Sequence, residues 1–459
     1  MTNQPQPQQQ PPPNRPPQPP MSSFDQFNAK VKASITLKLI AIGILILVLL
    51  IPTAMIESLI SERESRHNSA INEVSAKWGN DQTITGPVIT IPYKKFVKGK
   101  DKEIITATEY AHFLPDELNI NGDILPETRY RGIYKVVVYN AKLKINGSFH
   151  YPDFANWNIE PQNILWDEAF ISFGIPDMRG IKDSILLQWA NNPQPIPFNP
   201  GIPIRDIAGS GVSVRVPINK EVPLTFSFDL NLNGSKTLNF IPLGKETNIK
   251  LASNWSNPSF DGAFLPDKRE VTKSGFNATW KILQLNRNYP QQWRGADFDV
   301  SPSQFGVTLL LPVDEYQKSM RSAIYAKMII ALTFLALFFV EIIVKRRIHP
   351  FQYILVGLAL CVFYTLLLSI SEHLQFNSAY IVAAIATIAA ITLYAKAIFR
   401  QGIATAIMAL ILIILYAFIF IVIQLQDYAL LLGSIGLFIV LAILMFLSRK
   451  INWYSNSNS

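Results

Sequence analysis

The sequence predicts a multi-pass α-helical membrane protein that carries a large β-rich domain of antiparallel, sandwich-like build. Two observations predict this fold class. Apolar stretches of about 20 residues, the length that crosses a ~30 Å hydrocarbon core, occur once near the start of the chain and five times after residue 322. Between them, residues 60–322 have short strand-like patterns and no stretch that is long enough to span a membrane.

The composition agrees with a chain of two kinds of region and excludes several classes of protein. Of the 459 residues, 49% are hydrophobic and only 16% are charged, below the share of about 25% in soluble domains. The single cysteine excludes an intramolecular disulfide and a multi-cysteine metal site. The net charge of +8 comes from scattered side chains, and no Lys/Arg block exceeds three residues, so we expect no nucleic-acid partner.

The chain begins with a polar tail and a first membrane helix. The first 22 residues hold nine prolines and six glutamines, which cannot bury a core, so residues 1–30 are predicted to form a disordered tail. Residues 35–57 are mostly apolar and long enough to span the bilayer. This apolar run is too long for a cleaved signal peptide, which indicates a retained transmembrane helix.

Five further apolar stretches predict a transmembrane bundle over residues 325–447, followed by a short tail at residues 448–459. Only a few residues join one stretch to the next, so neighbouring helices must be antiparallel. The predicted helices are Tyr325–Val344, Phe351–Ile370, Asn377–Tyr394, Ile403–Gln424 and Tyr428–Leu447.

The distribution of Lys and Arg predicts the orientation in the membrane. With the N-terminus inside, ten basic residues flank the inner helix ends, whereas the short outer loops 371–376 and 425–427 hold none. We therefore expect both termini to be cytoplasmic and residues 60–322 to lie on the outer side. The ten residues are Lys30, Lys32, Lys38, Lys345, Arg346, Arg347, Lys396, Arg400, Arg449 and Lys450.

Residues 60–322 are expected to form the external β-rich domain, entered through a short amphipathic helix at residues 67–78. Several segments have the alternating or β-branched pattern of strands. Three Asn-Gly pairs are expected at hairpin turns, because a type I′ turn needs positive φ angles. The strand segments are 83–93, 135–139 and 224–232, and the pairs lie at 121–122, 146–147 and 233–234.

The sequence has no motif that requires an enzyme. It lacks the Gly-x-Ser-x-Gly elbow, the phosphate-binding P-loop, the His-Glu-x-x-His motif and the Gly-x-Gly-x-x-Gly fingerprint, and its five histidines are not spaced as paired metal ligands. We therefore expect no enzyme activity and assign no catalytic, cofactor-binding or metal-binding residue. A membrane enzyme with a dispersed site is kept as an alternative.

Three ionisable residues near the membrane helices are candidate functional positions. Glu341, close to the inner end of the second helix, suits either a proton or ligand site or an ion pair with Lys345 on the same helix face. Glu372 and His373 lie where the third helix emerges on the outer side. An imidazole with an ordinary pKa of about 6.5 would respond to external acidity there, and a solvated interfacial pair is the alternative.

The segment 254–266 is the candidate recognition element of the external domain. Its proline and glycine residues exclude a regular helix. Aromatic side chains on such a segment, among them Trp255 and Phe260, either close the core or recognise a ligand. We expect core closure and keep recognition as the alternative.

Several sequence motifs between about residue 33 and Tyr454 carry a resemblance to a known family. They include GPVITIP at 86–92, SNWSNPSFDGAFLP at 253–266, HPFQYILVGL at 349–358, SEH at 371–373 and NWY at 452–454. In these motifs and their order the chain resembles the CreD family of bacterial inner membrane proteins, which are described as cell envelope integrity proteins. The resemblance implies an inner membrane location, a periplasmic external domain and a role in envelope stress, and it brings no established catalytic residue.

Together these observations predict an inner membrane protein that supports cell envelope integrity through a periplasmic binding domain held on six transmembrane helices. Its expected partners are the lipid bilayer and a periplasmic envelope component or protein. A transporter or lipid-handling protein is an alternative. That alternative needs polar side chains at mid-depth of the helices, where this sequence is almost entirely apolar.

Overall fold

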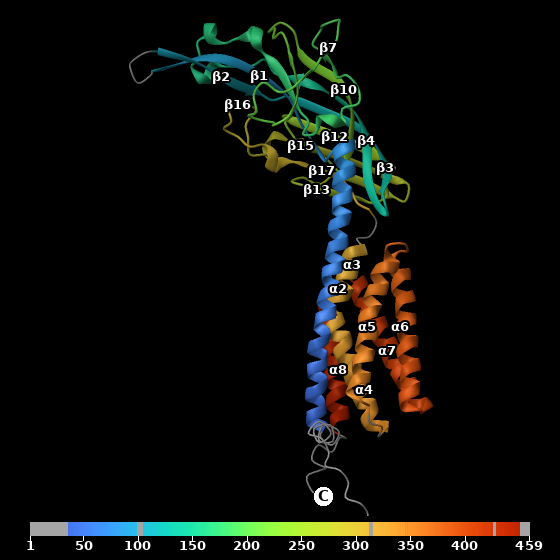
Figure 1. Cartoon of the computed structure of the whole chain (residues 1–459). Helices are drawn as coiled ribbons and strands as arrows, with labels where there is room; N and C mark the ends of the chain where they lie inside the picture. The colour runs from blue at the N-terminus through green and yellow to red at the C-terminus, as the bar shows by residue number, and fades with distance from the viewer. Residues whose placement is uncertain are drawn as a thin grey trace, which may run out of the picture. The chain divides into compact units, whose positions relative to one another are not determined.

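A computed structural model describes residues 35–98, 104–311, 315–344, 346, 348–425 and 428–449 (Figure 1). The predicted tail 1–30, most of the tail 448–459 and Lys345 lie outside the described residues. The chain divides into two compact units. The β-rich unit is Arg63–Asp314, and the helical unit joins the residues up to Glu62 with those from Glu315 onward.

The β-rich unit has two sheets. Within the described residues the first has nine strands, in the order β13-β17-β11-β1-β5-β9-β8, with β2 paired to β1 and β16 paired to β2. Its strands are β1 (Gln82–Lys98), β2 (Ile104–Phe113), β5 (Phe170–Gly174), β8 (Asn199–Pro200), β9 (Gly211–Arg215), β11 (Thr237–Phe240), β13 (Pro258–Gly262), β16 (Gln292–Arg294) and β17 (Phe305–Leu309).

The second sheet has eight strands among the residues described, in the order β14-β15-β12-β3-β4-β10-β6-β7. Its strands are β3 (Glu117–Arg131), β4 (Tyr134–Phe149), β6 (Leu186–Trp189), β7 (Ile196–Pro197), β10 (Leu224–Ser235), β12 (Glu246–Ser253), β14 (Lys268–Thr272) and β15 (Gly275–Leu283).

Both sheets are mixed, whereas the sequence predicted antiparallel pairing. Strand β1 is parallel to β11, and β3 is parallel to β12. The alternation of side chains along a strand is the same in both pairings, so the sequence pattern shows a strand without showing its direction. The prediction of a β-rich, sandwich-like domain is confirmed, and the expectation of purely antiparallel sheets is wrong.

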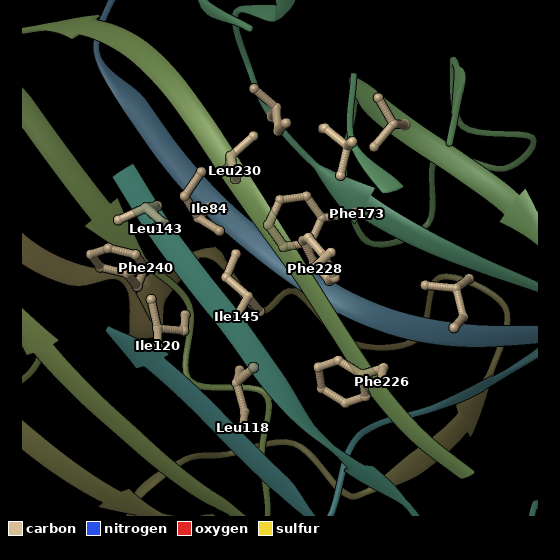
Figure 2. Packing of buried hydrophobic residues seen from close by; sticks show 14 of the residues in the cluster. Ile84, Leu118, Ile120, Leu143, Ile145, Phe173, Phe226, Phe228, Leu230 and Phe240 are labelled. Carbon is tan, nitrogen blue, oxygen red and sulfur yellow. The ribbon is translucent and has the colours of Figure 1, made fainter. Parts of the chain in front are cut away.

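The core of the β-rich unit lies between the two sheets. Figure 2 shows Ile84 of β1 and Phe240 of β11 packed with Ile145 of β4 and Phe228 of β10. All four side chains are at most 3% exposed. Alternate residues of β4 and β10 therefore point into the core, which leaves their neighbours on the opposite face of the sheet.

The three Asn-Gly pairs lie inside strands β3, β4 and β10, so the predicted hairpin turns are wrong. The glycines are needed for close packing. A Cβ atom on Gly147 would lie 1.9 Å from the carbonyl oxygen of Glu117, and one on Gly234 would lie 2.2 Å from the Tyr139 hydroxyl. The local Asn-Gly signal marks a turn only where the chain reverses, and here the strands continue through it.

The helical unit begins with α2 (Ile35–Trp78), one continuous helix that also enters the β-rich unit. Residues 67–78 are helical, as the sequence predicted, but they form the end of this long helix and not a short helix of their own. Residues 57–66 contain neither proline nor glycine, so nothing in them ends the helix. The other helices are α3 (Glu315–Ile324), α4 (Ala326–Val344), α5 (Pro350–Ser371), α6 (Phe376–Phe399), α7 (Gly402–Gln424) and α8 (Ala429–Ser448).

Within the described parts, helices α2, α4, α5, α6 and α7 are long and apolar enough to cross a membrane. The sixth predicted span corresponds to α8, whose described apolar part, Leu431–Ile443, is shorter. Its crossing therefore stays a prediction. Residues 315–322, which the sequence analysis assigned to the external domain, form most of α3 and belong to the helical unit.

Candidate functional site

A groove of about 840 Å³ lies on the outward face of the eight-stranded sheet. Strands β15, β12, β3, β4 and β10 form its floor. Along β4, Leu143 is buried in the core while its neighbours Lys142 and Lys144 are exposed. Side chains alternate between the two faces of each strand, and the apolar set faces the core. The polar set therefore forms the floor of the groove.

The register of the five strands aligns the outward side chains in two parallel rows. Neighbouring strands are about 4.8 Å apart, so each row is about 19 Å long. Directly opposite side chains on adjacent strands are close enough to bind one ligand together. The rows, from β15 to β10, are Thr279, Lys250, Asn121, Lys144, Asp229 and Asn277, Ala252, Asp123, Lys142, Asn231.

The charges in the groove are balanced. Three lysines and three aspartates line it, and among the described residues these lysines form no ion pair within 4.0 Å. Asn231 donates a hydrogen bond to Asp183 at 2.6 Å, which orients that carboxylate at the rim. The charged residues are Lys142, Lys144, Lys250, Asp123, Asp183 and Asp229.

This arrangement suits a neutral ligand with many polar groups. Lysine offers only donors, aspartate only acceptors, and asparagine both. A simple anion next to Lys144 would meet the carboxylate of Asp229 on the neighbouring strand, and a cation next to Asp123 would meet Lys142. A chain of hydroxyl and amide groups can satisfy both kinds of side chain at once.

No motif in the sequence marks the groove residues as a site. The only sequence pattern at these positions is the alternation of polar and apolar residues, such as Lys142-Leu143-Lys144 on β4, which indicates a strand with one exposed face. The order of the strands brings residues 121, 144, 229, 250 and 279 into one row, and strand order cannot be read from such a pattern.

The predicted recognition segment packs against the core and does not line the groove. Phe260 lies on β13, and its ring centroid is 5.6 Å from that of Phe276 and 5.8 Å from that of Trp280. Trp255 is half-buried, and its Nε1 donates to the carbonyl oxygen of Leu310 at 2.9 Å. These contacts favour core closure over ligand recognition.

Glu341 is at the centre of a buried polar contact between three helices. Lys38 of α2 donates a hydrogen bond to its carboxylate, and the hydroxyl of Tyr353 on α5 donates to Oε2 at 3.0 Å. Lys38 also donates to the carbonyl oxygen of Ile348 at 3.1 Å. The side chains of Lys38 and Glu341 are only 16% and 8% exposed. The partner is thus on another helix, and the expected partner Lys345 lies outside the described residues.

Glu372 and His373 follow directly after α5. Glu372 is the C-cap of this helix and is half-buried, whereas His373 is exposed. The backbone N–H of His373 donates to the carbonyl oxygen of Ile370 at 3.0 Å. These two residues therefore lie at a helix end of the helical unit, and the groove is built from the other unit.

A buried histidine that the sequence analysis did not single out connects two strands and a loop. His112 of β2 makes contacts of 3.0 Å from Nδ1 to Oγ1 of Thr90 and 3.1 Å from Nε2 to Oδ2 of Asp206. Burial lowers the pKa of His112, and Asp206 opposes this shift. Thr90 and His112 are each 1% exposed, so this set holds the strands and loop together and leaves no open hydroxyl for a substrate.

The five long apolar helices among the described residues and the two packed sheets define a multi-pass membrane protein with a large β-rich domain. Over residues 34–454 the sequence matches the family described as inner membrane protein CreD. It is also 33% identical over 420 residues to the inner membrane protein CreD of Escherichia coli (strain K12), an alignment that covers 90% of this chain and 92% of that protein. The chain therefore belongs to the CreD family of inner membrane proteins, and the resemblance seen in its motifs is confirmed.

Proposed function

We propose that this chain supports cell envelope integrity and the envelope stress response by binding an envelope component in the groove of its β-rich unit. The observation that carries the proposal is the pair of aligned polar rows on the eight-stranded sheet. Their lysines have no carboxylate partner among the described residues and are exposed. Exposed donors and acceptors that the fold holds in register are ready to bind a ligand.

The proposed location follows from the charge distribution of the sequence. Ten Lys and Arg residues flank one set of helix ends, and the short loops at the other ends have none. With both termini in the cytoplasm, the β-rich unit lies in the periplasm, and the apolar helices are held in the bilayer. The groove then faces the compartment that contains the envelope polymers.

The proposed ligand is a neutral polymer with hydroxyl and amide groups, and the proposed role is binding without catalysis. The rows of about 19 Å suit an extended chain of several units. The described residues that line the groove include no histidine, the side chain that most often acts as a general acid or base. Their lysines and aspartates are exposed, as binding residues need to be.

A double substitution in the groove tests this function. Lys144→Ala with Lys250→Ala removes two donors of one row, and the control Lys268→Ala with Lys273→Ala removes two exposed lysines elsewhere. Both proteins should reach wild-type abundance, because surface substitutions change stability little. In a deletion strain exposed to detergent stress, only the control should restore survival. Full rescue by an abundant groove variant would contradict the proposal.

A binding measurement tests the ligand class separately. The full chain in lipid nanodiscs is titrated with tetra-N-acetylchitotetraose, a neutral polymer that has both hydroxyl and amide groups. We expect saturable binding that becomes about tenfold weaker in the double variant, equivalent to about one hydrogen bond with a charged group. If the wild type does not bind, the ligand class is wrong.

A further inference from the structure

The hairpin of β3 and β4 ends in a tight turn with exposed side chains. Arg131 of β3 is paired with Tyr134 of β4, so only Gly132 and Ile133 form the turn. Gly132 has a φ angle of +60°, as a two-residue hairpin turn needs at its first position. Ile133 is 45% exposed, and Tyr130, which precedes Arg131, is 65% exposed. The tip thus presents an aliphatic and an aromatic side chain to its surroundings.

Contacts with the last turns of α2 give the direction of this hairpin (Figure 1). Nε1 of Trp78, the last residue of α2, donates to the carbonyl oxygen of Tyr139 at 3.1 Å, and the ring centroid of His67 is 5.5 Å from that of Tyr134. From Trp78 to His67 is about 16 Å along a helix, and from Tyr139 to Tyr134 is about 17 Å along a strand. The hairpin therefore follows α2, and its tip points toward the part of this helix that crosses the membrane.

The tip lies close to the place where α2 leaves the membrane. The membrane part of α2 ends between Glu57, whose carboxylate pairs with Lys327, and Ile60, which is still buried in the core of the helical unit. From there to His67, beside the tip, is at most about 15 Å of helix. The turn projects about 3 Å beyond Tyr134. Because lipid headgroups extend about 5–8 Å outside the hydrocarbon core, the exposed side chains at the tip can reach them.

The two faces of the tip have different neighbours. On one face, Nε of Arg131 donates to a glutamate of α2 at 2.9 Å, and Tyr134 contacts a histidine of the same helix. Successive residues of a strand point to opposite faces, so Tyr130 and Lys135 are on the other face. These two residues are directly opposite each other in the strand pairing, and both are exposed. With Ile133 in the turn, they form a small surface of aromatic, aliphatic and cationic side chains.

We propose that Tyr130, Ile133 and Lys135 dock this tip on the phospholipid headgroups of the bilayer that α2 crosses. Tyrosine is favoured at a membrane interface, because its ring is apolar and its hydroxyl is polar. The Ile133 side chain enters the boundary between headgroups and acyl chains, as the apolar residues of interfacial elements do. The ammonium group of Lys135 is a donor for the lipid phosphates.

Lipid docking at the tip needs neither the groove nor a particular orientation of the chain. Asp123 of the groove and Arg131 at the tip are about 26 Å apart along β3, so substitutions at the tip leave the groove intact. Both leaflets of a bilayer have phosphate headgroups, so the contact can form on whichever side the β-rich unit lies. It would attach this unit to the bilayer at a point other than its covalent links.

A fluorescent label at the tip tests the proposal on the full chain in phospholipid nanodiscs. Ile133→Cys is labelled with bimane in a Cys361→Ala background, which removes the native thiol. The matched control is Leu125→Cys on the same hairpin, because Leu125 is 47% exposed and lies about 20 Å from Arg131 along β3. Lipids with a nitroxide in the headgroup quench bimane only at short range, so we expect quenching several-fold stronger at position 133 than at position 125. Equal quenching at the two positions would overturn the proposal.

A second comparison tests whether these side chains hold the tip on the lipid. Tyr130→Ala with Lys135→Ala removes two of the proposed contacts while the label stays at position 133, and exposed substitutions of this kind should leave the fold intact. We expect quenching to fall several-fold, because alanine has neither an interfacial ring nor a donor for phosphate. The control Lys268→Ala with Val271→Ala changes two exposed side chains of β14 and should not alter quenching. Unchanged quenching in the tip variant would contradict docking through these residues.

Discussion

The two units place polar and apolar side chains in opposite ways. In the β-rich unit, Phe228 is buried and Lys144 is exposed. In the helical unit, Leu437 is 51% exposed, whereas Glu341 and the hydroxyl of Tyr364 are buried. One rule explains both patterns, because the surface of one unit suits water and that of the other suits lipid. Polar sites are therefore found on the face of the β-rich unit and inside the helical unit.

Truncation of a large side chain should lower the free energy of unfolding most in the core between the two sheets. Phe228 contacts Phe173 and Phe198, with ring centroids 5.0 and 5.4 Å away. We expect Phe228→Ala to lower the free energy of unfolding by about 3–5 kcal/mol. Leu437→Ala, on an exposed helix face, should change it by less than about 0.5 kcal/mol. Melting curves of both variants in detergent check this, and equal losses would contradict the contrast between the units.

Within the helical unit, substitution of a buried charged side chain should lower the free energy of unfolding the most. Glu341→Gln leaves the ammonium of Lys38 buried without its carboxylate, for which we expect a loss of about 3–5 kcal/mol in unfolding free energy. The control is Glu57→Gln, which breaks the more exposed ion pair with Lys327 at 3.3 Å and should cost less than about 1 kcal/mol. Melting temperatures of the two variants in nanodiscs are compared. A smaller loss of stability in Glu341→Gln than in Glu57→Gln would show that the Lys38–Glu341 pair is not stabilising.

A smaller, pH-dependent contribution to stability is expected from Asp177, which is bonded to the backbone just after the end of α2. Asp177 accepts hydrogen bonds from the backbone N–H of Asn80 at 2.9 Å and from Nε and Nη2 of Arg179, each at 2.8 Å. Hydrogen bonding to Arg179 lowers the pKa of Asp177 below its usual value of 3.8. The charged form is thus favoured by folding, so its contribution is complete above pH 3.8 and is lost as the pH falls through the lower folded pKa.

Asp177→Asn tests this contribution. We expect a loss of about 1–3 kcal/mol in unfolding free energy at pH 7, as for a broken hydrogen bond with a charged group. The difference in melting temperature between the wild type and the variant should narrow once the pH is below the usual carboxylate pKa. A difference that stays constant down to pH 3 would show that Asp177 does not act through its charge.

The sequence was sufficient to predict those helices and strands whose pattern lies within one stretch of neighbouring residues. The apolar run at 39–56 predicted a membrane helix because length and hydropathy decide this alone. The alternation at 224–232 predicted strand β10, since one face of it is buried. Both signals come from neighbouring residues and need no knowledge of what packs against them.

Features that depend on distant partners could not be predicted. Gly147 was taken for a turn residue, although it is required inside β4 because the Glu117 carbonyl oxygen approaches it closely. Lys144 and Lys250 are 106 positions apart in the sequence, and only the position of β3 between β4 and β12 brings them into one groove. The partner of Glu341 was sought four residues away and is on another helix.

The central claim, that the β-rich unit faces the periplasm, is tested most directly by two fusions to alkaline phosphatase, which is active only outside the cytoplasm. One fusion joins the enzyme after Leu311, at the end of the β-rich unit, and the other after Arg346, beyond α4. We predict high activity for the first fusion and none for the second at equal abundance. An inactive first fusion with an active second one would reverse the orientation and place the groove in the cytoplasm.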